Sequence, residues 1–266
     1  MPIPFTSAAL RAALLAGVLS LALRPIEAQT SSGAASAAPA ACPLGTARAG
    51  SRVLVFSKTA GFRHASIPNG IAAVKALGAS HNFAVEATED ASAFTDSSLH
   101  RFSAVVFMMT TGDVLDSAQQ AAFQRFIHGG GGYVGVHSAT DTEYDWPWYG
   151  QLVGAYFKRH PAIQQAKLDV VDRTHISTKC LTPVWTRTDE WYDFRAPPAA
   201  DAHILITLDE KSYQNGGMGA FHPVAWYHPF DGGRAFYTEL GHTPESYTDP
   251  AYLAHLAGGI LWAIAR

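Results

Sequence analysis

The chain has 266 residues, of which 48% are hydrophobic and 15% charged. This composition supports a sizeable core and excludes a largely disordered protein. The formal net charge is −3 and no run of lysine or arginine occurs, so neither nucleic acid nor an anionic membrane surface is an expected partner. Two cysteines exclude a four-thiolate zinc site. The 12 histidines are the compositional exception, since histidine binds metals and carries protons near neutral pH.

Residues 1–28 have the organisation of a secretory signal peptide. Arg11 precedes an apolar stretch over 12–23, and Ala28 ends a small-residue cleavage pattern before Gln29. The apolar stretch has about a dozen residues, too short for a helix across a bilayer core of roughly 30 Å. We therefore expect a secreted or periplasmic protein without a stable membrane span, and a retained anchor is the alternative.

Residues 29–50 are rich in alanine, serine, glycine and proline and lack periodicity, which predicts a linker. Cys42 lies in this linker and Cys180 lies in the domain predicted over 51–266. In an oxidising compartment the two cysteines can form a disulfide, and two free thiols are the alternative.

From residue 51 onward, short apolar runs alternate with helical patterns. Ser66 is expected to cap the first helix. Runs that are apolar on both faces and separated by helices are typical of a parallel, doubly wound sheet in a three-layer α/β fold. The predicted strands are 52–57, 83–88, 103–109 and 133–137, and the predicted helices are 66–81, 97–102 and 117–127.

The second half of the chain has a more mixed pattern. Residues 231–233 predict a hairpin turn, and residues 249–265 predict a closing amphipathic helix. The predicted strands are 167–172, 204–208, 223–227 and 234–239. No internal repeat occurs, so one domain is expected, and its uncovered sheet edges make a homodimer an expectation.

Polar residues follow several predicted strands at the point where each strand ends. His64 follows the first strand, His137 and Asp141 follow the fourth, and His242 follows the last. Because ligands of open parallel sheets bind beyond the carboxyl ends of the strands, we expect these side chains to line a site at that edge.

The sequence around His137 predicts a sharp strand-to-helix turn that exposes this side chain, like a nucleophile elbow. Histidine in this position suits acid–base chemistry or metal binding. No cysteine lies near the turn, which excludes a cysteine-dependent glutaminase. A serine hydrolase that uses Ser138, and a histidine held only by backbone partners, are the alternatives.

Six segments in order resemble the ThuA (trehalose utilisation) family, over about residues 51–266. They are Thr59-x-x-Phe62-Arg63-His64-x-Ser66-Ile67, Gly135-Val-His-Ser-Ala-Thr-Asp-Thr142, Leu152-x-Gly154-x-x-Phe157-x-x-His160, Asp189-Glu190-x-Tyr192, Pro223-x-x-Trp226 and Gly241-His242-Thr243. The resemblance implies a flavodoxin-like scaffold similar to the class I glutamine amidotransferases. His137 stands where those enzymes have their cysteine, so amidotransferase activity is not expected. The resemblance implies a carbohydrate partner, with oxidised (3-keto) sugars as its expected substrate class.

The candidate residues divide by role. Paired carboxylates can share acid and base roles, although the acidic pair, expected to enter from a loop, can also be a solvated turn. Arg63 can bind substrate or form a surface ion pair. The catalytic candidates are His137, His242, Glu190 and Asp189; the substrate-binding candidates are Arg63, His64, Ser138, Asp141, Tyr192 and Trp226; the metal-ligand candidates are His64, His137, His160 and His242.

Three functions are compatible with these residues. The first is an enzyme that transfers protons to and from an oxidised sugar, giving isomerisation, elimination or hydrolysis. The second is a hydrolase or lyase that binds a divalent metal with the same residues. The third is a sugar-binding domain without turnover.

Overall fold

A computed structural model describes residues 43–265 of the chain. The predicted signal peptide, most of the linker and Cys42 lie outside the described residues, so their assignments and the pairing with Cys180 stay predictions. Among residues 43–265, no helix is both long and apolar enough to span a membrane.

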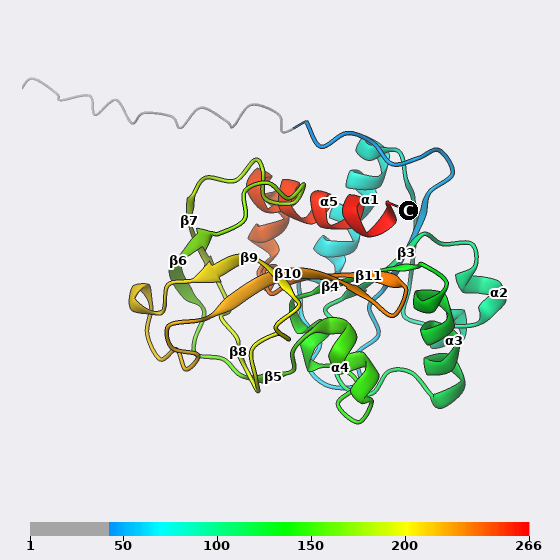
Figure 1. The fold of residues 1–266 in the computed structure, drawn as a ribbon, viewed down its shortest axis with the longest axis horizontal. Helices are drawn as coiled ribbons and strands as arrows, with labels where there is room; N and C mark the ends of the chain where they lie inside the picture. Colours follow the sequence, from blue (N-terminus) through cyan, green and yellow to red (C-terminus); the bar gives the residue numbers. More distant parts are fainter. Residues whose placement is uncertain (1–42, 266) are drawn as a thin grey trace, which may run out of the picture. The chain divides into compact units, whose positions relative to one another are not determined.

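A nine-stranded sheet forms the centre of the fold, in the order β2-β1-β3-β4-β11-β10-β9-β6-β7 (Figure 1). The first five strands of this order are parallel to one another, and the remaining four strands extend the sheet from β11 with antiparallel pairing. The parallel strands are β1 (Arg52–Phe56), β2 (Ala84–Thr88), β3 (Ala104–Met108), β4 (Gly132–Val136) and β11 (Gly233–Thr238). The antiparallel extension consists of β10 (Pro223–Phe230), β9 (His203–Leu208), β6 (Gln164–Val170) and β7 (Val184–Asp189). A separate ribbon pairs β5 (Phe157–Arg159) with β8 (Asp193–Phe194).

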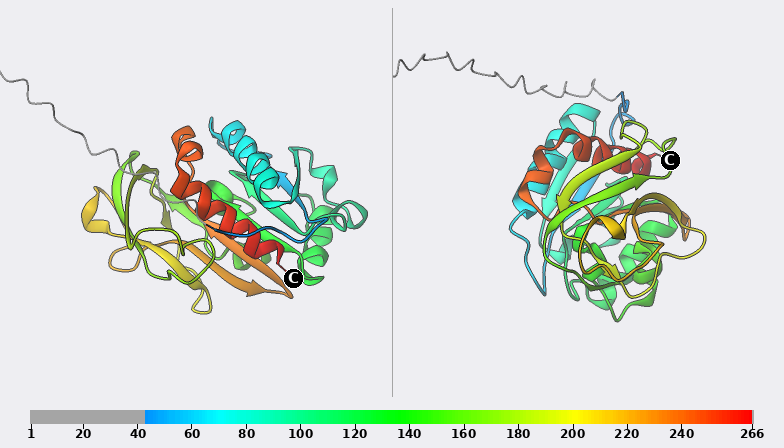
Figure 2. Two further views of the ribbon diagram at one scale, coloured as in Figure 1. Left: turned by 90° about the horizontal axis from the view of Figure 1, so that it is seen from above. Right: turned by 90° about the vertical axis from the view of Figure 1, so that its left-hand side faces the viewer.

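Helices cover both faces of the parallel half (Figures 1 and 2). On β3, Val106 and Met108 pack into the core beneath one set of helices, and Val105 and Phe107 pack into the core on the opposite face. This alternation follows from the two-residue period of a strand. The three-layer α/β architecture is therefore confirmed. One layer consists of α1 (Ile67–His81) and α5 (Pro250–Ile264), and the other of α2 (Asp96–Leu99), α3 (Ser117–His128) and α4 (Pro147–Val153).

The start of α1 differs from the sequence-based expectation. Ser66 makes no side-chain cap. Its hydroxyl instead donates to the backbone carbonyl of His242, at 2.6 Å. The helix begins with Pro68 in its first turn, where the missing N–H of proline costs no hydrogen bond. Ser66 thus fixes the loop after β11 rather than the helix end.

The acidic pair also enters the site differently from the expectation. Asp189 is the last residue of β7, a strand that the sequence analysis did not predict. Strand β7 alternates between exposed and buried residues, but two of its three buried residues, Arg187 and Asp189, are charged. The usual apolar alternation of a half-buried strand is therefore absent from its sequence. Strands β5 and β8 and helix α4 were also not predicted.

Candidate active site

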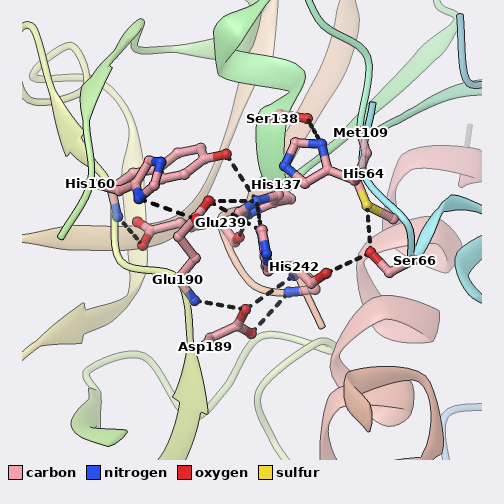
Figure 3. Close-up of polar contacts among 12 residues, drawn as sticks. His64, Ser66, Met109, His137, Ser138, His160, Asp189, Glu190, Glu239 and His242 are labelled. Atoms are coloured by element: carbon pink, nitrogen blue, oxygen red, sulfur yellow. Dashed lines mark hydrogen bonds and ion pairs between the residues drawn. The ribbon is translucent and has the colours of Figure 1, made fainter. Parts of the chain in front are cut away.

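Four side chains from separate segments meet at the carboxyl edge of the sheet (Figure 3). His64 follows β1, His137 follows β4, Glu190 follows β7 and His242 lies in the loop after β11. One nitrogen or oxygen atom of each side chain lies within 4.8 Å of those of the other three. We call these four residues the histidine–glutamate cluster.

His137 occupies the sharp turn predicted from the sequence. Its φ of 51° places it in the left-handed region directly after β4, a conformation that costs a non-glycine residue on the order of 1–3 kcal/mol. Two contacts hold it there: its Nδ1 lies 2.7 Å from the carbonyl of Glu239, and its own carbonyl accepts the Tyr237 hydroxyl at 2.8 Å. Because the Glu239 carbonyl only accepts, Nδ1 carries a proton and Nε2 faces the cluster.

Three polar atoms surround Nε2 of His137. The Tyr192 hydroxyl lies at 2.9 Å, Nδ1 of His242 at 3.0 Å and Oε2 of Glu190 at 3.4 Å. Burial raises the pKa of Tyr192 well above its usual value, so its hydroxyl keeps its proton and can donate it to Nε2. Tyr192 was predicted to bind substrate, and in the structure its hydroxyl contacts the cluster.

Glu190 and His242 form an ion pair of 3.1 Å within the cluster. Burial by itself raises the pKa of Glu190, but His137 and His242, which donate to it when protonated, outweigh burial and hold that pKa well below its usual range. Burial by itself lowers the pKa of His242, and the hydrogen bond and charge of Glu190 raise it. The two groups therefore favour a carboxylate beside an imidazolium.

His64 is buried and its Nδ1 lies 3.3 Å from the Ser138 hydroxyl. Its ring meets the rings of His137 and His242 edge-on, with centroids 4.7 and 5.1 Å apart. Burial, together with the positive charge that His137 and His242 can carry, lowers the pKa of His64 to about 3. His64 is thus neutral at physiological pH, which is the form of histidine that binds metals.

Asp189 holds the backbone beneath the cluster. Its carboxylate accepts the backbone N–H groups of Gly241 and His242, both at 3.0 Å. Oδ2 also pairs with Arg187 at 2.9 Å, and Oδ1 accepts the N–H of Glu190 at 3.1 Å. Both oxygens are taken by protein donors, so Asp189, predicted as catalytic, is placed as a positioning residue.

Three further predicted site residues, Asp141, Arg63 and His160, differ in their burial and in their contacts. Asp141 is half-buried and accepts the Tyr144 hydroxyl at 2.6 Å, and burial raises its pKa. Arg63 is exposed and forms a two-pronged ion pair with Glu89, at 2.6 and 3.1 Å, which is the surface alternative. His160 extends the cluster toward solvent, because Nδ1 lies 3.1 Å from Oε1 of Glu190 and the side chain is 42% exposed.

Trp226, predicted as a substrate-binding residue, is instead part of the core. It is fully buried, its indole N–H donates to the carbonyl of Val153 at 2.9 Å, and its ring lies 4.4 Å from that of Tyr237. Gly154, with a φ of +97°, packs directly against the indole, where a Cβ atom would collide. Trp226 therefore belongs to the core and presents no face on which a sugar can stack.

Two contributions to the site were not predicted from the sequence. The Glu239 carbonyl orients His137, and the Glu239 side chain accepts the backbone N–H of Tyr192 at 2.7 Å. Glu239 is fully buried, which raises its pKa well above the usual range. The sequence signal for Glu239 was a charged residue at the end of an apolar strand. Because it fell within the predicted strand 234–239, it was assigned no role in the site.

A second group of ligand-type side chains lies beside the site and has a different character. We call Asp193, Glu210 and His222 the Asp193 cluster; their ligand atoms also lie within 4.8 Å of one another. Here the guanidinium of Arg159 pairs with Asp193 at 2.5 Å. His222 uses Nε2 to donate to the Tyr192 carbonyl at 2.8 Å, and its Nδ1 lies 3.0 Å from Glu210. The guanidinium of Arg159 therefore already balances negative charge in this cluster.

Solved structures share this fold. A ThuA-like protein from Bacteroides uniformis has a TM-score of 0.70 at 21% identity, covering 83% of this chain and 94% of its own. A ThuA-like protein from Parabacteroides merdae has a TM-score of 0.65 at 19% identity, covering 80% and 90%. A β-galactosidase from Bacillus circulans has a TM-score of 0.51 at 15% identity, covering 82% of this chain and 31% of its own.

Among curated proteins, no match to the chain is found. Residues 52–263 match a family described as trehalose utilisation, which covers nearly all of the described part of the chain. These residues contain the whole sheet and all four members of the histidine–glutamate cluster. The chain belongs to the ThuA (trehalose utilisation) family.

Proposed function

We propose that this chain is an enzyme that processes a carbohydrate, with 3-keto sugars or glycosides as its substrate class, and that its histidine–glutamate cluster binds a divalent metal ion. Membership of a family described as trehalose utilisation supports the carbohydrate class. The observation that carries the proposal is the convergence of three imidazole nitrogens and one carboxylate oxygen from four separate segments.

The donor set fits a divalent transition metal. Imidazole suits zinc, copper, iron and nickel, and a carboxylate completes a four-ligand shell. The surroundings fit as well, because Nδ1 of His137 donates to a backbone carbonyl and Nδ1 of His64 contacts the Ser138 hydroxyl. Such outer contacts fix the orientation and tautomer of metal-binding histidines.

A divalent metal would polarise a carbonyl oxygen or lower the pKa of water, both useful with an oxidised sugar. The chain's own residues supply the proton handling beside it. His160 contacts Glu190 and reaches solvent, so its imidazole can exchange protons between the site and water. The Tyr192 hydroxyl, kept protonated by burial, lies 2.9 Å from Nε2 of His137, and with a metal on that nitrogen it would donate to a bound ligand instead.

A second candidate uses the same residues without a metal. The ion pair of Glu190 and His242, with the pKa of Glu190 lowered and that of His242 raised, favours it. In this mechanism Glu190 takes a proton from the carbon next to the keto group, and His242 donates one to the oxygen. Opposite shifts of neighbouring groups are typical of acid–base pairs.

The first experiment is the metal content of the mature protein, residues 29–266, prepared without chelator. His137→Ala is compared with His100→Ala, whose side chain is exposed and outside the cluster. We expect about one equivalent of a divalent metal in the parent and in His100→Ala, and loss in His137→Ala. A parent that stays metal-free after incubation with Zn²⁺, Mn²⁺, Fe²⁺ and Co²⁺ contradicts the metal proposal.

Turnover of a methyl 3-keto-glucoside then separates the remaining functions. Activity that survives complete metal removal favours proton transfer by Glu190 and His242. Binding of the sugar without any product over long incubation favours a sugar-binding domain and contradicts an enzyme.

We also propose that the protein acts outside the cytoplasm, on the basis of the signal peptide predicted for residues 1–28. Expression of the full chain should yield a mature N-terminus at Gln29 in a periplasmic or secreted fraction. An unprocessed N-terminus in the cytoplasmic fraction contradicts export.

A further inference from the structure

Phe62 is an exposed aromatic ring beside the buried cluster. Its relative exposure is 66%, whereas that of His64, two residues later, is 4%. The two rings are in edge-on contact, with centroids 4.8 Å apart and planes at 82°. A ligand that lies on the phenyl ring would therefore adjoin a side chain of the histidine–glutamate cluster.

The backbone around Phe62 is held in place by the neighbouring loop. The Thr111 hydroxyl donates to the Phe62 carbonyl at 2.8 Å and accepts the N–H of Gly61 at 3.2 Å. The N–H of Ala60 donates to the Thr111 carbonyl at 2.7 Å. The ring is thus presented by an ordered segment, so binding a ligand on it costs little backbone entropy.

The position of Phe62 argues against a protein-binding patch. The other exposed large apolar side chains of the described residues lie in or next to strands of the antiparallel extension; they are Ile163, Val171, Val184 and Phe221. Phe62 instead follows β1 in the parallel half, without an exposed apolar neighbour from that group. A single ring matches a small ligand better than a protein surface of standard size.

We propose that Phe62 is the stacking platform for the sugar ring that enters the histidine–glutamate cluster. This inference rests on the proposed function and names the residue that selects a pyranose ring. The C–H face of a pyranose is apolar and matches an exposed phenyl ring, while its hydroxyls need polar partners.

The test compares Phe62→Ala with Phe62→Trp and with Phe221→Ala, a matched loss of an exposed phenyl ring elsewhere. Binding of methyl 3-keto-α-glucoside and of trehalose is measured by saturation-transfer NMR, which detects weak ligands without turnover. We expect Phe62→Ala to raise the Kd about three- to tenfold, as for loss of one aromatic stacking contact. Phe62→Trp should bind at least as tightly as the parent, and Phe221→Ala should match the parent.

Kinetics on the 3-keto-glucoside provide the second measurement. Phe62→Ala should raise KM with kcat and metal content unchanged, because stacking binds ground state and transition state alike. Unchanged binding in Phe62→Ala, or an equal loss in Phe221→Ala, overturns the platform while the proposed function stands. Sugar binding that depends on Phe62 without any turnover supports the platform and overturns the enzyme. A parent that binds neither sugar overturns the platform.

Discussion

The histidine–glutamate cluster and the Asp193 cluster both combine histidine with carboxylate side chains, but different cations balance the charge of their carboxylates. Asp193 is paired with Arg159, whereas Glu190 is paired with histidines, one of which reaches solvent. The two clusters are joined through Tyr192, whose hydroxyl contacts His137 and whose carbonyl accepts His222.

This difference shows why ligand-type residues close together do not by themselves define a site. In the Asp193 cluster a guanidinium balances the buried carboxylate, and the imidazole is fixed by a backbone carbonyl. In the histidine–glutamate cluster the charge of Glu190 is balanced only if a neighbouring histidine is protonated or an external cation binds. The first arrangement stabilises the fold, and the second is the one on which the proposed function depends.

The largest expected effect comes from removing the charge of Glu190, with the same substitution at Glu210 in the Asp193 cluster as its control. Glu190→Gln should lower turnover of a 3-keto-glucoside by roughly 10²-fold or more and release the bound metal. Glu210→Gln should leave both within about twofold, because Glu210 contributes no atom to the histidine–glutamate cluster. Initial rates and metal analysis measure both effects. Equal losses of turnover and metal in the two variants would contradict the different roles assigned to the two clusters.

A smaller effect is expected from removing the protein cation. Asp193 is only 2% exposed and would lose the partner of its charge in Arg159→Met. Because the arginine side chain is 46% exposed, we expect a loss of about 1–3 kcal/mol in the free energy of unfolding rather than a fully buried charge penalty. Urea unfolding measures this loss of free energy, and the metal content of the variant should be unchanged.

The control for this stability prediction is the double variant Arg159→Met with Asp193→Asn, which removes the unpaired charge. Its unfolding free energy should recover part of the loss. An ion pair would be contradicted if the double variant lost more unfolding free energy than the two single variants lose together.

The smallest expected effect is a contrast in pH dependence of the metal-free protein. The folded pKa of His242 is raised above 6.5, so its stabilisation is complete below pH 6.5 and is lost as pH rises through the folded pKa. Burial lowers the folded pKa of His222 below 6.5, so stability falls as pH drops from 6.5 toward that pKa.

Urea unfolding at several pH values measures this contrast. His242→Gln should flatten the alkaline side of the stability profile, and His222→Gln should flatten the acid side. Variants that alter the same side of the profile would contradict the opposite environments assigned to the two histidines.

Most of the parallel half of the fold was predictable because its central strands are apolar on both faces. The predicted strands 103–109 and 133–137 correspond to β3 and β4, and every residue of those two strands is buried. The turn at His137 was predictable because a strand that runs directly into a short helix leaves its next residue at the edge of the sheet. Three members of the cluster follow parallel strands, so their convergence was also predictable.

The parts that the sequence did not predict depend on contacts distant in the chain. Strand β7 is stabilised by its pairing with β6. Its sequence lacks the apolar alternation of a half-buried strand, because the buried residue Arg187 is charged. The burial of Trp226 depends on Gly154, 72 positions away, and the placement of Arg63 depends on an ion pair with Glu89. A single sequence gives no signal for such pairings.

The way the loop at His242 is held has a consequence for how this centre can diversify. Its N–H is bound by Asp189 and its carbonyl by Ser66, so the main chain keeps its course whichever side chain occupies the position. The contacts that hold this loop therefore do not depend on the side chain at position 242. In the proposed metal centre, replacement of His242 by aspartate or cysteine would offer a harder or a softer ligand to the metal without changing the course of the backbone, giving protein engineers one position at which to change the metal preference.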